Sequence, residues 1–365
     1  MKTGKTLIPA LLFFWVSCLN MISENPLFAQ ASSSLPADSP APAGWPEEAK
    51  TVYYLSSADN TPQPAVFYAP EQNADSEPIP LIVGLHTWSH DFRQKNTYFF
   101  HGAKKRNWAM ICPNFRGRND KPEACGSELA VADIVSAVEY AKSRAKIDPS
   151  RVYLMGCSGG GYGSMLLAAR HPEIWAGVCE WAGIADLADW YRTTKEAKLG
   201  YWKHLASVCG GAPGESPEID KQYAVRSPLT HLANASSVPL SINHGIHDGH
   251  NSQSVPVSHA IRAFNLLAKT ENQITGEQMN FIVSNAEIPA DLKSEPLEDS
   301  EFGRTKILFR RSDGNVRLTI FDGGHTLVAE AGFEWLARQR KGQPADWSVK
   351  NKEKNDQILE IQSGK

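Results

Sequence analysis

The stretch RVYLMGCSGGGYG, residues 151–163, is the strongest structural signal in this chain. Its first half is an apolar run typical of a buried strand, its middle is crowded with glycine, and residues 164–170 continue it as a helix. The turn contains Gly156-x-Ser158-x-Gly160, in which a serine occupies a sharp strand-to-helix corner with its hydroxyl exposed. The pattern also occurs in ordinary turns, but the flanking strand and helix favour a nucleophilic serine.

Apolar runs and helical patterns alternate on both sides of this stretch. Continuous apolar runs, typical of strands buried on both faces, cover residues 80–86, 108–112, 174–181, 240–244 and 316–321. Helical spacing of apolar residues covers 99–105, 126–145, 255–269 and 327–341. This alternation predicts an α/β fold, with a mainly parallel central sheet and helices on both faces.

Other segments depart from this alternation. Residues 51–55 and 65–68 predict an antiparallel hairpin. Residues 186–225 lack a strand pattern and predict a helical, lid-like excursion over the site. Residues 270–313 are polar and read as an insertion whose last strand forms a hairpin with the run at 316–321. Residues 343–365 are polar and weakly patterned, which predicts a loose tail.

The first 31 residues have the pattern of a secretory signal peptide. Two lysines precede an apolar run over residues 7–18, and small residues at Ala29 and Ala31 provide cleavage positions. The run is too short for a comfortable membrane span. We therefore expect the protein to be secreted or periplasmic.

A lipoprotein signal is a poorer fit, because Trp15 stands three residues before Cys18. Residues 32–49 are rich in serine, proline and alanine and predict a flexible linker. One folded domain is therefore expected over residues 50–342.

Composition narrows the function. The 365 residues are 42% hydrophobic and 21% charged, as in ordinary globular proteins. A net charge of −3 and the lack of a basic run argue against nucleic acid as a partner. The oligomeric state is not indicated by the sequence.

The cysteines leave two alternatives open. Export would permit disulfides, and Cys112 with Cys125 is the most local pair. The other interpretation is that these residues are small buried thiols. Cys157, inside the glycine-rich turn, is expected to be buried and free.

Two later turns provide groups that could serve Ser158. In an open parallel sheet, functional residues gather at the carboxyl ends of the strands. Asp248 follows the run at 240–244, and His325 follows the run at 316–321. Their order, Ser158, Asp248, His325, is that of a nucleophile, an acid and a base in acyl transfer.

The chain resembles the catalytic domain of the prolyl oligopeptidase family, in the α/β-hydrolase superfamily, from about Pro80 to Ala337. The resemblance rests on residues 112–117, the glycine-rich turn, residues 227–231, the His244-Gly245-x-x-Asp248 turn and the glycines before His325. It implies an α/β-hydrolase fold, no cofactor, and Ser158, Asp248 and His325 as the catalytic triad. The family's peptidases carry an N-terminal β-propeller, and roughly 50 residues before the core cannot hold one.

An oxyanion hole needs two hydrogen-bond donors. The N–H of Gly159 is the first candidate. The second is expected from the loop after the early strand, at Thr87 or Trp88. Many relatives have His-Gly where this chain has His86-Thr87-Trp88, so the assignment is open by one residue.

Rival roles compete for some of these residues. His244, His247 and His250, with Asp248, could suggest zinc, but their directions should diverge in a turn. Glu180, at the end of its strand, is an alternative triad acid. Asp322 is interpreted as a turn former. No metal is therefore expected.

Aromatic residues and a histidine near the site are candidates for a substrate pocket: His86, Trp181, Trp190 and Tyr191. Packing onto the core is the favoured interpretation, and the alternative is a stacking surface for a sugar ring or an aromatic acyl group. For His86 and for His90 a structural role is favoured.

These patterns predict an exported serine hydrolase that works through a covalent acyl-enzyme. We expect a small-molecule carboxylic ester as substrate, including an acylated saccharide, because the propeller is missing. The alternatives are a serine-type peptidase that cleaves short peptides, and a non-catalytic binding module with a hydrolase fold.

Overall fold

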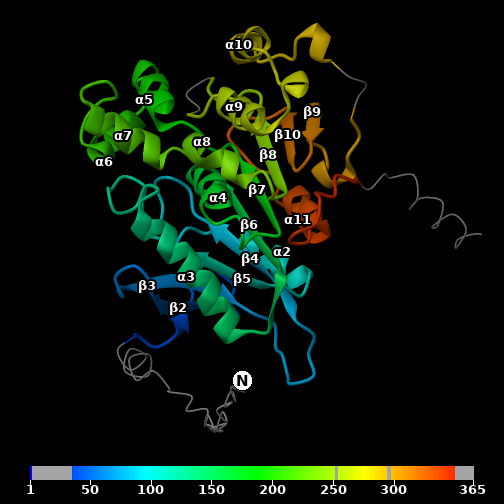
Figure 1. The fold of residues 1–365 in the computed structure, drawn as a ribbon. Coiled ribbons are helices and arrows are strands. Elements are labelled where there is room, and N and C mark those ends of the chain that lie inside the picture. Colours follow the sequence, from blue (N-terminus) through cyan, green and yellow to red (C-terminus); the bar gives the residue numbers. More distant parts are fainter. Residues whose placement is uncertain (2–34, 251–253, 294–296, 350–365) are drawn as a thin grey trace, which may run out of the picture. The chain divides into compact units, whose positions relative to one another are not determined.

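The computed structural model describes residues 1, 35–250, 254–293 and 297–349. Its central feature is a ten-stranded sheet in the order β1-β2-β3-β5-β4-β6-β7-β8-β10-β9 (Figure 1). The strands are β1 (Ser39–Pro40), β2 (Lys50–Leu55), β3 (Pro62–Tyr68), β4 (Ile79–Leu85), β5 (Ala109–Pro113), β6 (Ile147–Cys157), β7 (Gly177–Trp181), β8 (Leu240–Gly245), β9 (Ile307–Asp313) and β10 (Val316–Phe321).

The middle of the sheet is parallel. Strands β5, β4, β6, β7, β8 and β10 pair in parallel, whereas β1 to β3 and β9 add antiparallel strands at the two edges. The expected α/β fold and the early hairpin are confirmed. Strand β7 begins at Gly177 rather than at the predicted Ile174, because residues 171–174 form a turn after the preceding helix.

Helices cover both faces of the sheet. Helices α2 (Thr97–Lys105) and α11 (Ala329–Arg338) pack on one face, and α3 (Glu128–Arg144), α4 (Gly159–Arg170) and α9 (Ser258–Leu267) on the other. Side chains alternate between the faces along each strand. On β4, Leu81 and Val83 join one apolar cluster and Ile82 joins the other.

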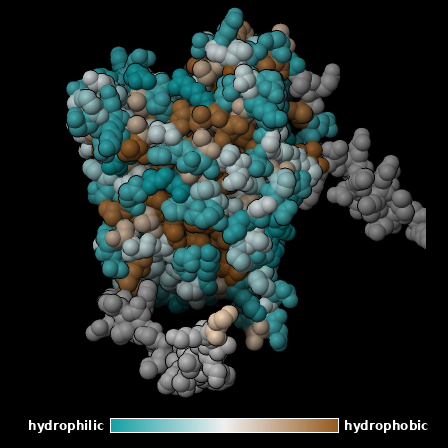
Figure 2. All heavy atoms as spheres, in the orientation of Figure 1, coloured by the Kyte–Doolittle hydropathy of each residue, from teal (hydrophilic) through white to brown (hydrophobic). Residues whose placement is uncertain are grey.

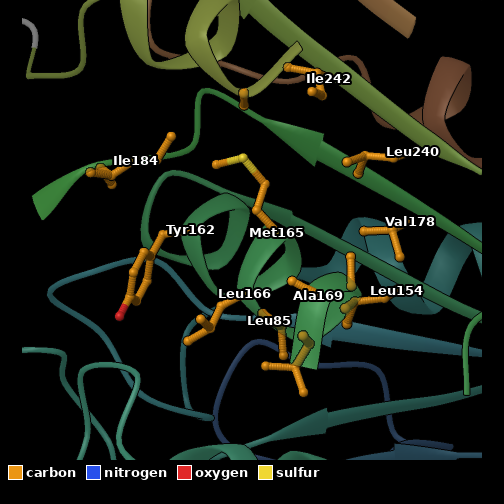
Figure 3. Packing of buried hydrophobic residues seen from close by; sticks show 14 of the residues in the cluster. Leu85, Leu154, Tyr162, Met165, Leu166, Ala169, Val178, Ile184, Leu240 and Ile242 are labelled. Carbon is orange, nitrogen blue, oxygen red and sulfur yellow. The ribbon is translucent and has the colours of Figure 1, made fainter. Parts of the chain in front are cut away.

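Helix α4, which follows the glycine-rich turn, is buried along most of its length. Its small residues let it lie close to the sheet. Figure 3 shows Met165, Leu166 and Ala169 of this helix packing among side chains of the neighbouring strands, including Leu154, Val178 and Leu240. This packing fixes the position of the turn.

The expected helical excursion is present between β7 and β8. It consists of α5 (Leu187–Glu196), α6 (Tyr201–Cys209), α7 (Pro217–Arg226) and α8 (Pro228–His231). Asp186 caps α5 by accepting from the N–H groups of Ala188 and Asp189, at 2.9 and 3.0 Å. On the face shown in Figure 2, the region of α5 to α7 is mainly hydrophilic.

The segment over residues 270–313 is more ordered than the sequence predicts. The expected hairpin is confirmed, because β9 pairs antiparallel with β10 across Gly314 and Asn315. The segment also contains a helix that was not predicted, α10 (Gly276–Asn285). Reciprocal bonds between Thr275 and Gln278 form a capping box at its start.

Two segments expected to be loose are partly folded. Strand β1 pairs with β2 and Trp45 is buried, so the linker expected over residues 32–49 is wrong from about Ser39 on. In the tail expected over 343–365, Trp347 stacks on Trp335 with ring centroids 5.2 Å apart. Long-range partners stabilise both segments, and local composition does not indicate them.

The signal peptide expected over 1–31 lies, apart from its first residue, outside the described residues.

The five cysteines that the structure describes are buried, free thiols. Cys112 and Cys125 belong to the apolar clusters on opposite faces of the sheet. The structure therefore favours the buried-thiol alternative over a disulfide. Among the described helices, none has the length and apolar character needed to cross a membrane.

Candidate active site

Ser158 occupies a strained corner between β6 and α4. Its φ is 59° and its ψ is −122°, a region that residues other than glycine rarely adopt. Its N–H donates to the carbonyl of Trp181 at 2.9 Å, and its own carbonyl accepts from Tyr162 in the first turn of α4. The corner is held by the strand on one side and by the helix on the other.

Two glycines permit this tight turn. A Cβ on Gly156 would lie 2.3 Å from the carbonyl oxygen of Gly160. A Cβ on Gly160 would lie 2.6 Å from the carbonyl oxygen of Leu85. Because both contacts are to backbone atoms, no side-chain rotation could relieve them.

The acid and base loops are joined at the carboxyl ends of β8 and β10. His247 donates its N–H to the carbonyl of Gly323 at 3.0 Å. A Cβ on Gly245 would lie 2.2 Å from the carbonyl oxygen of Gly324, so glycine is required where the loops meet. The junction brings Asp248 and His325 together.

The Asp248 carboxylate is buried and fully bonded. One oxygen accepts from the N–H groups of Gly249 and Val255, at 2.9 and 3.1 Å. The other lies 2.6 Å from Nδ1 of His325 and 3.3 Å from Nε2 of His244. Burial alone would raise the pKa of Asp248, but the hydrogen bonds from His244 and His325 outweigh it and hold the pKa well below its ordinary value.

The loop after β4 lies directly against the start of α4. A Cβ on Gly159 would lie 2.3 Å from the backbone nitrogen of Trp88. The N–H of Thr87 donates to the side chain of Gln94 at 2.8 Å. The N–H of Trp88 donates to no group in the part of the chain that the structure describes. Thr87 and Trp88, the two candidates for the second oxyanion donor, therefore differ in whether their N–H is already bonded. No sequence pattern indicates that Gln94 accepts from Thr87.

His86 lies beneath this loop rather than in a pocket. Its ring nitrogens are 3.0 Å from the carbonyl oxygens of Thr87 and Asn114, and the ring stacks on Phe115 at 3.8 Å. Burial lowers the pKa of His86 despite these two hydrogen bonds. His86 thus ties the loop after β4 to the loop after β5. His90 contacts the Thr87 hydroxyl at 3.0 Å, on the same loop.

The aromatic pocket candidates lie in the core. Trp181, Trp190 and Tyr191 are each no more than 5% exposed. Trp181 packs against Phe302 and Phe321, on the face of the sheet covered by α2 and α11. This burial matches the packing interpretation. Trp190 does approach the site, because its ring lies 4.6 Å from that of Trp88.

The zinc alternative is not supported by the directions of His244 and His247. His244 points inward to Asp248, whereas His247 is exposed and pairs with Asp322 at 3.0 Å. Within the described ranges, no three potential metal ligands converge. Asp322, which the sequence predicts as a turn former, thus also pairs with His247 between the loops that follow β10 and β8.

Glu180 lies beside the glycine-rich turn that holds Ser158, but its carboxyl group contacts Gly183 and not His325. It is fully buried, and one oxygen accepts from the N–H of Gly183 at 3.0 Å. Its other oxygen has no partner among the described residues. Burial raises the pKa of Glu180 to about 8, against the effect of the Gly183 hydrogen bond. Its side chain is therefore largely protonated at neutral pH.

Glu180→Gln is expected to remove a pH dependence of stability. The folded state keeps a proton that the unfolded state releases above pH 4.5, so stability is full below that pH and falls as pH approaches 8. The buried His259, whose pKa burial lowers from 6.5 to about 4, opposes this trend only below pH 6.5. Between pH 6.5 and 8 the wild-type free energy of unfolding should fall by up to about 2 kcal/mol, and the variant should lose this slope.

The measurement is urea unfolding at several pH values in that interval. Glu271→Gln, at an exposed position, is the matched control and should keep the wild-type slope. If the free energy of unfolding depends on pH in the same way in the wild type and in Glu180→Gln, Glu180 is not protonated in the folded state.

A groove of about 590 Å³ lies where the insertion meets the acid and base loops. His247 and Asp322 line it from the loops, and the insertion side includes Ile288, Lys306, Ile307 and Leu308. Glu287 and Lys293 line it as well, so the groove combines apolar and charged side chains. Its volume is within the range usual for ligand sites.

A sequence model described as the prolyl oligopeptidase family matches residues 93–281, more than half of the chain. The match includes Ser158 and Asp248 and ends before His325. Dipeptidyl aminopeptidase BIII of Pseudoxanthomonas mexicana is 26% identical over 223 residues, which are 56% of this chain and 30% of that protein. Poly(3-hydroxyalkanoate) depolymerase C of Paucimonas lemoignei is 28% identical over 186 residues, 46% of this chain and 40% of that protein.

A solved structure, the acylaminoacyl peptidase of Pyrococcus horikoshii, is similar in fold. The TM-score is 0.55 at 15% identity, over 86% of this chain and 44% of that one. At this identity the likeness concerns the fold, an α/β-hydrolase fold. The chain spans less than half the length of each of these three relatives.

Proposed function

The chain belongs to the prolyl oligopeptidase family, and on this premise we propose that it is a serine hydrolase with Ser158, Asp248 and His325 as its triad. The observation that carries the proposal is the 2.6 Å contact between His325 and the buried Asp248 carboxylate. The strained Ser158 corner, at the end of β6 in the same sheet, supports it.

Each member of the triad has a distinct role in this proposal. The Ser158 hydroxyl attacks the carbonyl carbon of the substrate, while His325 takes its proton and then gives it to the leaving group. Asp248 fixes the imidazole tautomer, since a proton on Nδ1 of His325 leaves Nε2 unprotonated and able to act as the base. Water then hydrolyses the acyl-enzyme by the same steps.

The oxyanion hole is assigned to the N–H groups of Gly159 and Trp88. The close approach of Gly159 to the Trp88 nitrogen supports this pairing. Thr87 is less suitable, because its N–H is already bonded to Gln94. The two donors would stabilise the negative charge that develops on the substrate oxygen.

We favour a carboxylic ester as the substrate, including an ester of a carbohydrate. Similarity to a poly(3-hydroxyalkanoate) depolymerase supports ester chemistry at this kind of site. The groove beside His247 and Asp322 offers space for one of the groups flanking the ester bond. Its apolar lining residues, among them Ile288 and Leu308, would suit an alkyl or aryl group.

Cleavage of short peptides is the second candidate. Similarity to a dipeptidyl aminopeptidase favours it, and the family's own description points to peptide bonds. Both candidates use the same acyl-enzyme chemistry, so they differ only in the leaving group. A non-catalytic binding module is the third possibility to be tested.

A fluorophosphonate probe tests for a reactive serine. We expect the wild-type protein to be labelled at Ser158 under native conditions and not after heat unfolding. Labelling would be located by mass spectrometry of the digested protein. Native protein that stays unlabelled would favour the binding module.

Matched substrates separate the two hydrolase candidates. We expect kcat/KM for acetyl and feruloyl esters to exceed that for proline-containing peptide amides by at least about tenfold, since an alkoxide leaves more easily than an amine. Faster turnover of the amides would make the peptidase the better description.

A further inference from the structure

The carboxylate of Asp248 accepts from two imidazoles, and only one belongs to the proposed triad. Both contacts are to Oδ2: Nδ1 of His325 at 2.6 Å and Nε2 of His244 at 3.3 Å. His325 is partly exposed, whereas the His244 side chain is completely buried. His244 therefore approaches the carboxylate from the interior.

The surroundings of His244 determine which of its nitrogens carries hydrogen. Nε2 faces two acceptors, the Val255 carbonyl oxygen at 2.9 Å and the Asp248 carboxylate. Two acceptors can be satisfied only if Nε2 is protonated. In the neutral ring Nδ1 is then an acceptor, and it is buried without a partner among the described residues.

His259, on α9, has the complementary pattern. Its Nδ1 lies 3.4 Å from the backbone nitrogens of Ala185 and Asp186, both of which are donors. Nδ1 of His259 is therefore unprotonated, and Nε2 carries the hydrogen. Nε2 is also buried without a partner in the described part of the chain. Burial lowers the pKa of His259 to about 4, against the charges of Asp189 and Asp186, so the ring is neutral at pH 7.

The two unsatisfied atoms match each other. Nε2 of His259 is a buried donor and Nδ1 of His244 is a buried acceptor, and neither has a direct partner among the described residues. Buried polar groups in proteins are generally paired, and one water would join these two. Joining them would give a continuous chain from His259 through His244 and Asp248 to His325.

We propose that His244 is a positioning residue for Asp248, held in its Nε2-protonated tautomer by His259. The proposed triad thus continues into the core as two buried histidines. This inference rests on the proposed function. Without the His244 donor, Oδ2 would lose one of its two hydrogen bonds and the carboxylate could rotate away from His325.

Two substitutions of His244 separate this role from simple packing. His244→Gln keeps a donor close to the position of Nε2, whereas His244→Phe keeps a planar ring without one. We expect His244→Phe to lower kcat for the best ester about 10- to 100-fold with KM within about twofold, and His244→Gln to stay within about fivefold of wild type. His101→Gln and His101→Phe, at an exposed position on α2, are the matched controls.

Unchanged kcat in His244→Phe, or equal losses in the two His244 variants, would overturn the proposal. A change confined to KM would overturn it as well. Thermal unfolding of each variant shows whether the fold is retained.

A second measurement does not depend on turnover or on the folding of a variant. Two-dimensional NMR of the ¹⁵N-labelled wild-type protein reports which ring nitrogen is protonated. We expect hydrogen on Nε2 of both His244 and His259, and the opposite tautomer of either ring would contradict the chain. If the wild type hydrolyses neither esters nor amides, the proposed function fails while this tautomer test still stands.

Discussion

Ser158→Ala is expected to abolish hydrolysis, lowering kcat for the best ester by at least about 10⁴-fold. The Ser158 hydroxyl is the group that attacks the substrate carbonyl in this proposal, and alanine has no nucleophile in its place. Stability should change little, because serine and alanine meet the same strain at a φ of 59°. His325→Ala should cost nearly as much, and the double variant no more than either one, because the residues act as a unit.

Turnover and fluorophosphonate labelling are measured on purified variants, with Tm as the check on folding. Ser164→Ala is a matched control on the same helix: its buried hydroxyl donates to the Gly160 carbonyl at 2.8 Å. That variant should lose about 1 kcal/mol of stability but keep its labelling. Full labelling of Ser158→Ala would place the reactive group elsewhere.

Gly159→Ala is expected to lower kcat by about 10²- to 10³-fold while leaving Ser158 in place. The added Cβ would lie 2.3 Å from the Trp88 nitrogen and 2.5 Å from its Cα, so the loop after β4 must move away. That movement separates the two proposed oxyanion donors. The close approach is between backbone atoms, so a rotamer change cannot relieve it.

The control is Gly200→Ala, because a Cβ there would meet no atom within 4 Å. It should keep wild-type kcat. If Gly159→Ala also keeps wild-type kcat and wild-type Tm, the loop is not the second half of the oxyanion hole.

The sequence predicts the layers of this fold well because buried parallel strands leave a direct trace. Runs such as residues 80–86 are apolar on both faces, and the structure has β4 there with every residue buried. The sequence also predicts that Ser158, Asp248 and His325 lie at one edge of the sheet. Each of them follows a strand, and the carboxyl ends of these parallel strands lie at the same edge.

Features that depend on direction or on distant partners are not predictable in the same way. Trp181 is close to the site along the chain, but the alternation of a strand turns its side chain to the opposite face. Thr87 and Trp88 are equivalent in sequence until Gln94 is seen to occupy one of their N–H groups. Strand β1 exists only through its pairing with β2.

The buried thiols have a practical consequence for experiments on this protein. Burial raises the pKa of Cys125, Cys157, Cys179 and Cys209 to about 12, and that of Cys112 further. Because the thiolate is the reactive form, alkylating reagents should meet almost no reactive sulfur in the folded domain. Folding of the described part also requires no oxidant, so production in a reducing cytoplasm is suitable. The rate at which a thiol-reactive dye labels the protein then reports how fast the core opens on either face of the sheet.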